Sequence, residues 1–157
     1  MIGIESKEVK TTISIDTVIY GMAVRCRTIY YCTGYNGLTI LNLSDKSVSD
    51  IINSDMTEVY YVATSGDKLY YTKVFLHNVT CCDLHGTTQW EFNDKHALHT
   101  PCGIAIDNDG NVYVVGCRSN NVVVFPLMYN AIDNYCLPRM VCDVRVYLIM
   151  TNIPIGY

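Results

Sequence analysis

The sequence predicts an all-β fold, a partial β-propeller of about three four-stranded antiparallel blades with a divergent C-terminal segment. Apolar residues rich in Val, Ile and Tyr come in short clusters between Gly, Asn, Asp and Ser, which is typical of strands and turns. The clusters recur at a nearly fixed period, since Tyr71 follows Tyr31 by 40 residues and Tyr113 follows Tyr71 by 42. An antiparallel unit of about 40 residues is the length of one propeller blade.

The first two blades are predicted from clusters of similar length. Residues 1–20 are a lead-in, and one interpretation makes them the outer strand of a preceding blade. Blade one is predicted at residues 21–57, with strands at 21–25, 28–33, 37–42 and 46–51. Blade two is predicted at residues 58–98, with strands at 59–63, 68–73, 78–83 and 88–92.

Blade three is predicted at residues 99–137 and repeats the pattern a third time. Its expected strands are 103–107, 111–115 and 121–125, and the Asn-Asp-Gly turn at 108–110 suits positive φ. The tetrapeptide at 21–24 recurs in similar form at 103–106. Residues 138–157 are a divergent tail, in which the alternation from Cys142 to Met150 predicts one strand. Because closed propellers have about four to eight blades, we interpret the chain as a fragment of a longer protein.

Residues 101–125 resemble an NHL repeat. PCGIAID at 101–107 is similar to the opening strand of that repeat, GNVYV at 110–114 to the second strand, and NNVVVF at 120–125 to the closing strand. Gly116 and Asn121 stand where the family usually has Asp and Arg, so the ion pair of the family is not expected here. The chain is similar in particular to the propeller portion of tripartite-motif-like proteins. That resemblance implies a ubiquitin ligase parent whose catalytic part is absent from these residues.

Charge and hydropathy argue against two classes of partner. The net charge of −4 leaves no excess positive field for a phosphate backbone, so nucleic-acid binding is disfavoured. The uncharged stretch at residues 146–157 is shorter than the roughly 18 apolar residues of a membrane helix, so no membrane span is expected. The first ten residues lack the continuous hydrophobic segment of a secretory signal, and we therefore expect a cytoplasmic location.

The eight cysteines are expected to be reduced thiols. Cys81 and Cys82 are adjacent, so that in a strand they point to opposite faces. Cys117 directly follows a Val-rich run, where a thiol behaves as a small buried hydrophobe. The alternative is the disulfide framework of a secreted protein.

Three groups of residues have the composition of a chemical site, and we interpret each as structural. His96, His99 and Cys102 could ligate zinc, but their spacing fits no closed motif and favours a polar loop between two blades. His99 and Cys102 could also form a base and a nucleophile, but no nearby carboxylate would orient them. Residues 107–111 resemble the start of a calcium loop, yet no Glu ends it, and a hairpin turn is the simpler interpretation. We expect no catalytic residue, no metal and no cofactor.

The loops after the second strand of each blade should open on one rim of the propeller. Aromatic and Arg side chains are typical of protein-binding hot spots. We therefore predict a surface that binds a protein or peptide, formed by Tyr35, Lys73, Phe75, His77, Arg118 and Asn120. Single-stranded RNA is the weaker alternative because only Lys73 and Arg118 supply cations. A metal-dependent lyase or lactonase is a further alternative, but the predicted inner strands are almost entirely apolar. Self-association through the open faces of the end blades is also expected.

Overall fold

The computed structural model describes residues 12–34, 36–52 and 59–126, and every regular element in these ranges is a β-strand. Blade one contains β1 (Gly21–Arg25), β2 (Thr28–Cys32), β3 (Leu38–Asn42) and β4 (Val48–Ile52). Blade two contains β5 (Val59–Ser65), β6 (Lys68–Lys73), β7 (Asn78–Asp83) and β8 (Thr88–Asn93). Blade three contains β9 (Pro101–Ile106), β10 (Val112–Gly116) and β11 (Asn121–Phe125).

Each blade is an antiparallel meander in which consecutive strands are hydrogen-bonded neighbours. This arrangement confirms the predicted all-β partial propeller, and the strand bounds agree with the sequence to within two residues at most ends. The expected fourth strand of blade three and the tail at 138–157 lie outside the described residues. In the lead-in, residues 12–20 contain no strand.

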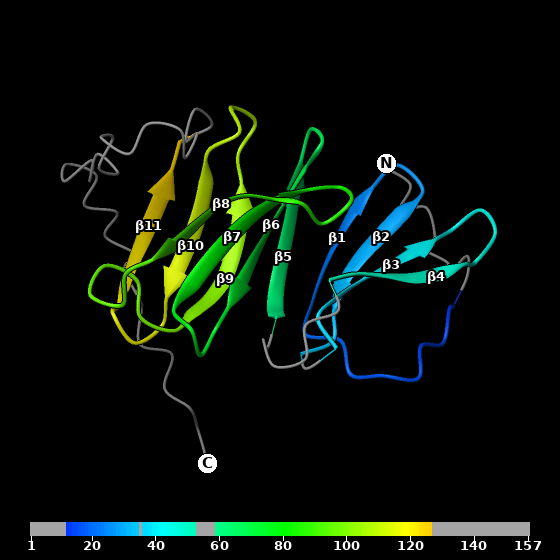
Figure 1. The fold of residues 1–157 in the computed structure, drawn as a ribbon, viewed down its shortest axis with the longest axis horizontal. Helices are drawn as coiled ribbons and strands as arrows, with labels where there is room; N and C mark the ends of the chain where they lie inside the picture. The colour runs from blue at the N-terminus through cyan, green and yellow to red at the C-terminus, as the bar shows by residue number, and fades with distance from the viewer. Residues whose placement is uncertain (1–11, 35, 53–58, 127–157) are drawn as a thin grey trace, which may run out of the picture.

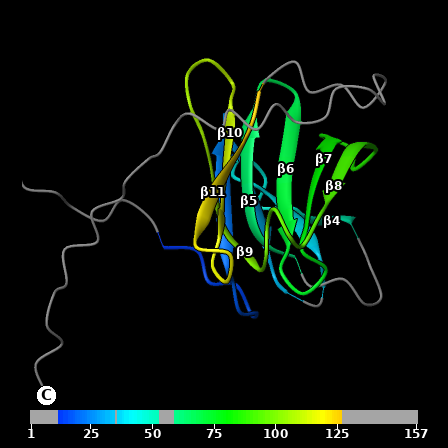
Figure 2. The same ribbon diagram turned by 90° about the vertical axis from the view of Figure 1, so that its left-hand side faces the viewer.

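The three sheets stand side by side, with their first strands adjacent (Figure 1). β5 packs against β1 on one side and against β9 on the other. The approach of β1 to β5 is close enough to require glycine, because a Cβ at Gly21 would lie 2.6 Å from the Tyr60 carbonyl oxygen. Two backbone hydrogen bonds also join the blades, since Gly34 and Val59 exchange N–H···O contacts of 3.2 and 3.1 Å. Figure 2 looks onto the outer side of blade three, with the strands of blade two behind it.

Two apolar cores lie between the blades, and adjacent residues of one strand supply different cores. Tyr70 and Cys81 belong to the core between blades two and three, whereas Tyr71 and Cys82 belong to the core between blades one and two. This division confirms the prediction that Cys81 and Cys82 point to opposite faces of a strand, and Tyr70 and Tyr71 follow the same rule. Stacking therefore buries both faces of blade two.

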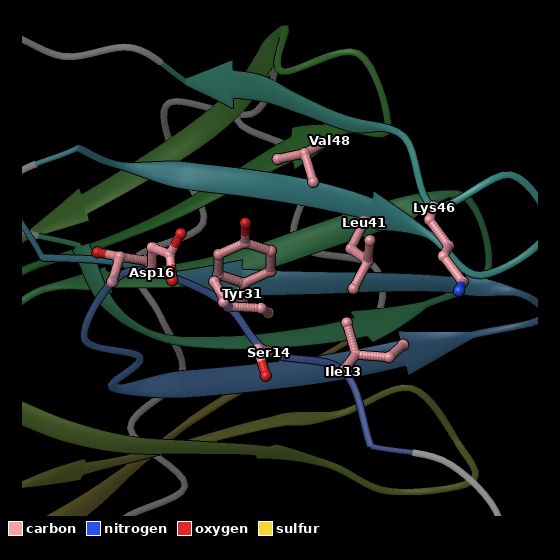
Figure 3. Close-up of a pocket in the computed structure, with 9 residues that line it drawn as sticks. Ile13, Ser14, Asp16, Tyr31, Leu41, Lys46 and Val48 are labelled. Atoms are coloured by element: carbon pink, nitrogen blue, oxygen red, sulfur yellow. The ribbon is translucent and has the colours of Figure 1, made fainter.

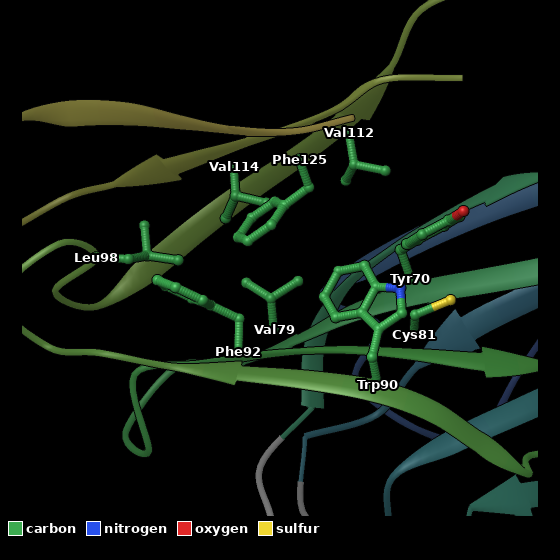
Figure 4. Packing of buried hydrophobic residues seen from close by; sticks show 9 residues of the cluster. All are labelled: Tyr70, Val79, Cys81, Trp90, Phe92, Leu98, Val112, Val114 and Phe125. Carbon is green, nitrogen blue, oxygen red and sulfur yellow. The ribbon is translucent and has the colours of Figure 1, made fainter. Parts of the chain in front are cut away.

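The core between blades two and three is built on aromatic rings (Figure 4). Phe125 is fully buried, and its ring centre lies 5.4 Å from that of Trp90 and 5.1 Å from that of Phe92. Leu98 and Val114 are also fully buried in this cluster. Burying a side chain of this size contributes about 1.5–3 kcal/mol, so β11 holds blade three on blade two largely through Phe125.

Candidate protein-binding rim

Three connections meet at one end of blades two and three. They are the β6–β7 loop at residues 74–77, the β8–β9 connection at 94–100 and the β10–β11 loop at 117–120, which we call the loop rim. The loops that follow β6 and β10 lie at the lower end of the view in Figure 1. The expectation that corresponding loops share one end of the molecule therefore holds for these two blades.

The residue just before the third strand of each blade adopts positive φ. The angle is 83° at Gly37, 54° at His77 and 52° at Asn120. This left-handed conformation turns the chain sharply into the third strand. Glycine adopts it without steric cost, whereas His and Asn at the same place need support from their surroundings.

A pair of stacked histidines supports the loop rim. The rings of His77 and His99 lie 4.4 Å apart with an interplanar angle of 22°. The Thr100 amide donates a hydrogen bond of 3.1 Å to His77 Nδ1, and Thr100 itself has a positive φ of 57°. These contacts join the β6–β7 loop of blade two to the entry of blade three.

A disulfide between Cys102 and Cys117 joins the start of β9 to the β10–β11 loop. Beside it, the Cys117 amide donates to Thr100 O at 3.0 Å and the Arg118 amide donates to His99 O at 3.1 Å. The expectation of reduced thiols is therefore wrong for this pair. Cys117 does not act as a buried hydrophobe, because it lies past the end of β10 where its backbone meets the segment before β9.

A neutral hydrogen-bond network joins the start of β11 to the β8–β9 connection. Asn121 Nδ2 donates to Ala97 O at 2.6 Å, and Ser119 Oγ donates to Asn121 Oδ1 at 2.6 Å. The absence of a side chain at Gly116 makes room for this network, because a Cβ there would collide with the Ser119 hydroxyl. Asn121 thus links β11 to the β8–β9 connection through amide and hydroxyl contacts.

Aromatic and aliphatic side chains project from the loop rim. Phe75 is 67% exposed and Leu76 is 48% exposed. Phe75 is held from one side by Tyr60, with 6.1 Å between ring centres, and Tyr60 in turn meets Tyr20 at 4.5 Å. Phe75 and Leu76 are therefore exposed at the loop tip, while contact with Tyr60 holds the Phe75 ring in place.

The electrostatic environment of His77 is positive. Burial lowers the pKa of His77 most, and the positive charges of His99, Lys95 and Arg118 lower it further. His77 is therefore mainly neutral at pH 7, which suits its role as acceptor of the Thr100 amide hydrogen.

The six predicted site residues are only partly brought together. Phe75, His77, Arg118 and Asn120 belong to the loop rim, where Arg118 and Asn120 are exposed. Lys73 ends β6 and forms an ion pair of 2.9 Å with Glu91, so its charge is engaged within the sheet. Tyr35 lies outside the described residues.

Sequence reasoning missed the part that His99, Lys95 and Leu76 have in the loop rim. In the sequence, His99 is a candidate zinc ligand or base, and Lys95 is one more polar residue of the connection between blades. Only the three-dimensional entry into β9 brings them beside the β6–β7 loop. Leu76 could have been recognised as a candidate binding residue from the sequence. It forms an apolar pair with Phe75 in the loop between two strands, where the loop itself offers no apolar residue to cover the pair.

Asp107 holds the turn between β9 and β10 through its carboxylate. Asp107 Oδ1 accepts the amides of Asp109 and Asn111 at 3.0 and 2.8 Å, and Asp107 Oδ2 accepts from the Asn111 side chain and Tyr113 Oη at 2.9 Å each. This is the predicted hairpin turn. Within the described residues, no group of three or more His, Cys, Asp or Glu side chains is placed to hold a metal ion. Nowhere in those ranges is there a helix with the length and hydropathy that crossing a bilayer requires.

A depression lies between the lead-in and blade one (Figure 3). It has a volume of about 460 Å³ and is open to solvent. Ile13 and Asp16 border it from the lead-in, and Tyr31, Leu41 and Val48 border it from the sheet. Tyr31 and Leu41 are almost fully buried. The lead-in segment therefore covers part of the outer face of blade one.

Comparison with solved structures places the fold among β-propellers. The chain is similar to a structure of a nidogen/laminin complex, with 18% identity, a TM-score of 0.52 and coverage of 69% of this chain and 48% of that one. It is similar to virginiamycin B lyase from Staphylococcus aureus crystallised with quinupristin, with 18% identity, a TM-score of 0.58 and coverage of 68% and 37%. It is also similar to BamB from Moraxella catarrhalis, with 16% identity, a TM-score of 0.57 and coverage of 76% and 37%.

These similarities define the class of fold, a partial β-propeller. At such identities they show the fold alone. The chain spans less than half the length of each of these three structures. Neither the comparison with protein-family models nor that with curated proteins gave a match, so the NHL resemblance of residues 101–125 stays an interpretation of the sequence.

Proposed function

We propose that the chain is a protein-interaction module that holds a protein or peptide partner on the loop rim. The observation that carries the proposal is the exposed Phe75–Leu76 pair on a loop whose base is fixed by neighbouring blades. Exposed apolar side chains that are already held in place lose little conformational entropy on binding, and such residues dominate the energy of protein interfaces.

We also propose that this chain has no catalytic activity. The two groups closest to a catalytic pair are otherwise engaged, since Cys102 is in a disulfide and His99 Nδ1 lies 3.2 Å from the Thr100 hydroxyl. Cys81 and Cys82 are buried, and burial raises the pKa of each thiol, to about 11 and about 12 respectively. Buried thiols with raised pKa values are poor nucleophiles.

A finer form of the proposal places the module in a tripartite-motif-like ubiquitin ligase, where it would select substrates. Its support is the NHL-like sequence at residues 101–125. The sequence of the flanking transcript tests it: an upstream RING or B-box would support this parentage, and a full-length reading frame without either would exclude it.

The interaction itself is tested by placing a photo-crosslinking amino acid at position 75 of the chain in its native cells. The control carries the same amino acid at position 67, in the exposed β5–β6 hairpin at the opposite end of blade two. We expect a discrete crosslinked partner from position 75 and not from position 67. The purified partner should then bind the Phe75→Ala chain at least about tenfold more weakly, as for a hot-spot residue. Equal crosslinking from both positions, or unchanged affinity, would contradict the proposal.

A further inference from the structure

The loop rim has more positive than negative charge, Lys95 and Arg118 against Asp94, on a chain whose net charge is −4. Lys95 and Arg118 are exposed, and their charges act on His77 together with that of His99. The Arg118 amide is bonded to the His99 carbonyl, so the β10–β11 loop and the β8–β9 connection present these groups side by side. Asp94 lies in the same connection, where its carboxylate accepts the amide hydrogens of His96 and Ala97.

The apolar pair adjoins this positive surface directly. Phe75 and Leu76 immediately precede His77, whose ring stacks on His99. A partner segment that covered both regions would therefore meet apolar anchors at one end and cations at the other. Arg favours carboxylates in particular, because its guanidinium can donate two parallel hydrogen bonds to one carboxylate.

We infer that the loop rim binds an acidic peptide segment that carries an aromatic or large aliphatic anchor. The inference rests on the proposed protein-binding function and specifies the chemistry of its partner. The anchor packs on Phe75 and Leu76, and carboxylates of the same segment lie over Lys95 and Arg118. Charge complementarity of this kind sets specificity and association rate, whereas the apolar contact supplies most of the affinity.

An anionic membrane surface is the competing occupant, since a loop tip with Phe and Leu beside cations can also touch lipid. Among the described rim residues, the permanently positive side chains are Lys95 and Arg118, and Asp94 adds one carboxylate. Each cation near an anionic bilayer contributes about 1 kcal/mol, which is too little for stable attachment without further anchors. The observations therefore favour a peptide.

The test uses the full chain and fluorescent synthetic peptides, with binding followed by anisotropy. The first peptide has glutamates on both sides of a Phe-Leu pair. In the second, glutamines replace the glutamates, and in the third, serines replace the Phe-Leu pair. We expect the first peptide to bind at least about tenfold more tightly than either of the others, with an affinity that falls as salt is added.

Protein variants locate the binding. Lys95→Glu with Arg118→Glu should weaken binding of the first peptide by about tenfold or more. The matched control, Lys68→Glu with Arg27→Glu, makes the same change of charge beside the β5–β6 and β1–β2 hairpins and should leave the affinity within about twofold. Urea unfolding of each variant checks that it is folded.

Several outcomes overturn the inference. Equal binding of the glutamine peptide shows that acidity does not matter, and equal loss in the control variant shows an effect of net charge alone. Binding to phosphatidylserine vesicles but to none of the peptides assigns the surface to a membrane. If a partner is crosslinked at position 75 but the bound segment is neutral or basic, this inference fails while the proposed function stands. If no partner is crosslinked there, the proposed function fails as well.

Discussion

Removal of the Cys102–Cys117 disulfide should destabilise the chain by an amount that follows from the length of the loop it closes. The two cysteines are separated by 15 residues. Closing a loop of this length removes conformational entropy from the unfolded chain that is equivalent to about 3 kcal/mol at 25 °C. With a urea dependence of about 1–3 kcal/mol per molar for a small domain, the unfolding midpoint should fall by about 1–3 M.

The assay is urea unfolding followed by circular dichroism, for the chain before and after reduction and for the Cys102→Ser, Cys117→Ser double variant. Reduction and the double substitution should lower the midpoint by similar amounts. Cys26→Ser is the control, because this thiol is exposed and unpaired, and it should change neither the midpoint nor the response to reductant. If the oxidised chain and the double variant unfold at the same midpoint, the disulfide does not stabilise the fold and the reasoning is refuted.

Three further predictions concern the core, the open face and the histidine pair. Phe125→Ala should cost about 3–5 kcal/mol in urea unfolding, whereas Val124→Ala, at a position 38% exposed on the other face of β11, should cost less than about 1 kcal/mol. The chain should self-associate at micromolar concentration, and Val115→Asp, in the exposed face of blade three, should reduce the mass measured by light scattering; a wild-type monomer would contradict this. In NMR, the imidazole of His77 should titrate at a pH below the ordinary histidine pKa. The stability is therefore full above the ordinary pKa, which applies to the unfolded chain, and it is lost as the pH falls from there through the lowered pKa of the folded chain. Arg118→Ala should move the His77 pKa upward, and an unchanged pKa would show that Arg118 has no such effect.

The strands could be predicted because their signal is local. In β6 and β7, alternation and the spacing between turns fix both the element and the faces of its side chains. Tyr70 and Tyr71 are adjacent in β6, so the strand period sends their side chains to opposite faces, and the structure places them in different cores. The period near 41 residues then predicts that successive sheets stack, because each blade alone leaves an apolar face uncovered.

The disulfide could not be predicted in the same way, because it depends on a register. β9 begins at Pro101, two residues before the expected strand, and its pairing with β10 shifts between Val114 and Gly116. The shift sets Gly116 opposite Pro101 and brings Cys117 to the segment that precedes β9. Sequence alone fixes the faces of a strand but not a bulge in its pairing. The spacing alone therefore predicts a loop at Cys102, whereas this residue lies in β9.

The backbone conformation of the loop rim is a second feature that could not be predicted from local sequence. Each blade needs positive φ just before its third strand, and blade one meets the need with Gly37 at no steric cost. Blade two uses His77 at the same place, and the cost is offset by contacts from the next blade, namely the Thr100 amide and the His99 ring. A strained residue persists only where its surroundings hold it, and such positions concentrate at functional sites. The replacement of the permissive glycine by a histidine that depends on a neighbouring blade is therefore consistent with a rim that is built for binding, and no local pattern in the sequence could have revealed that dependence.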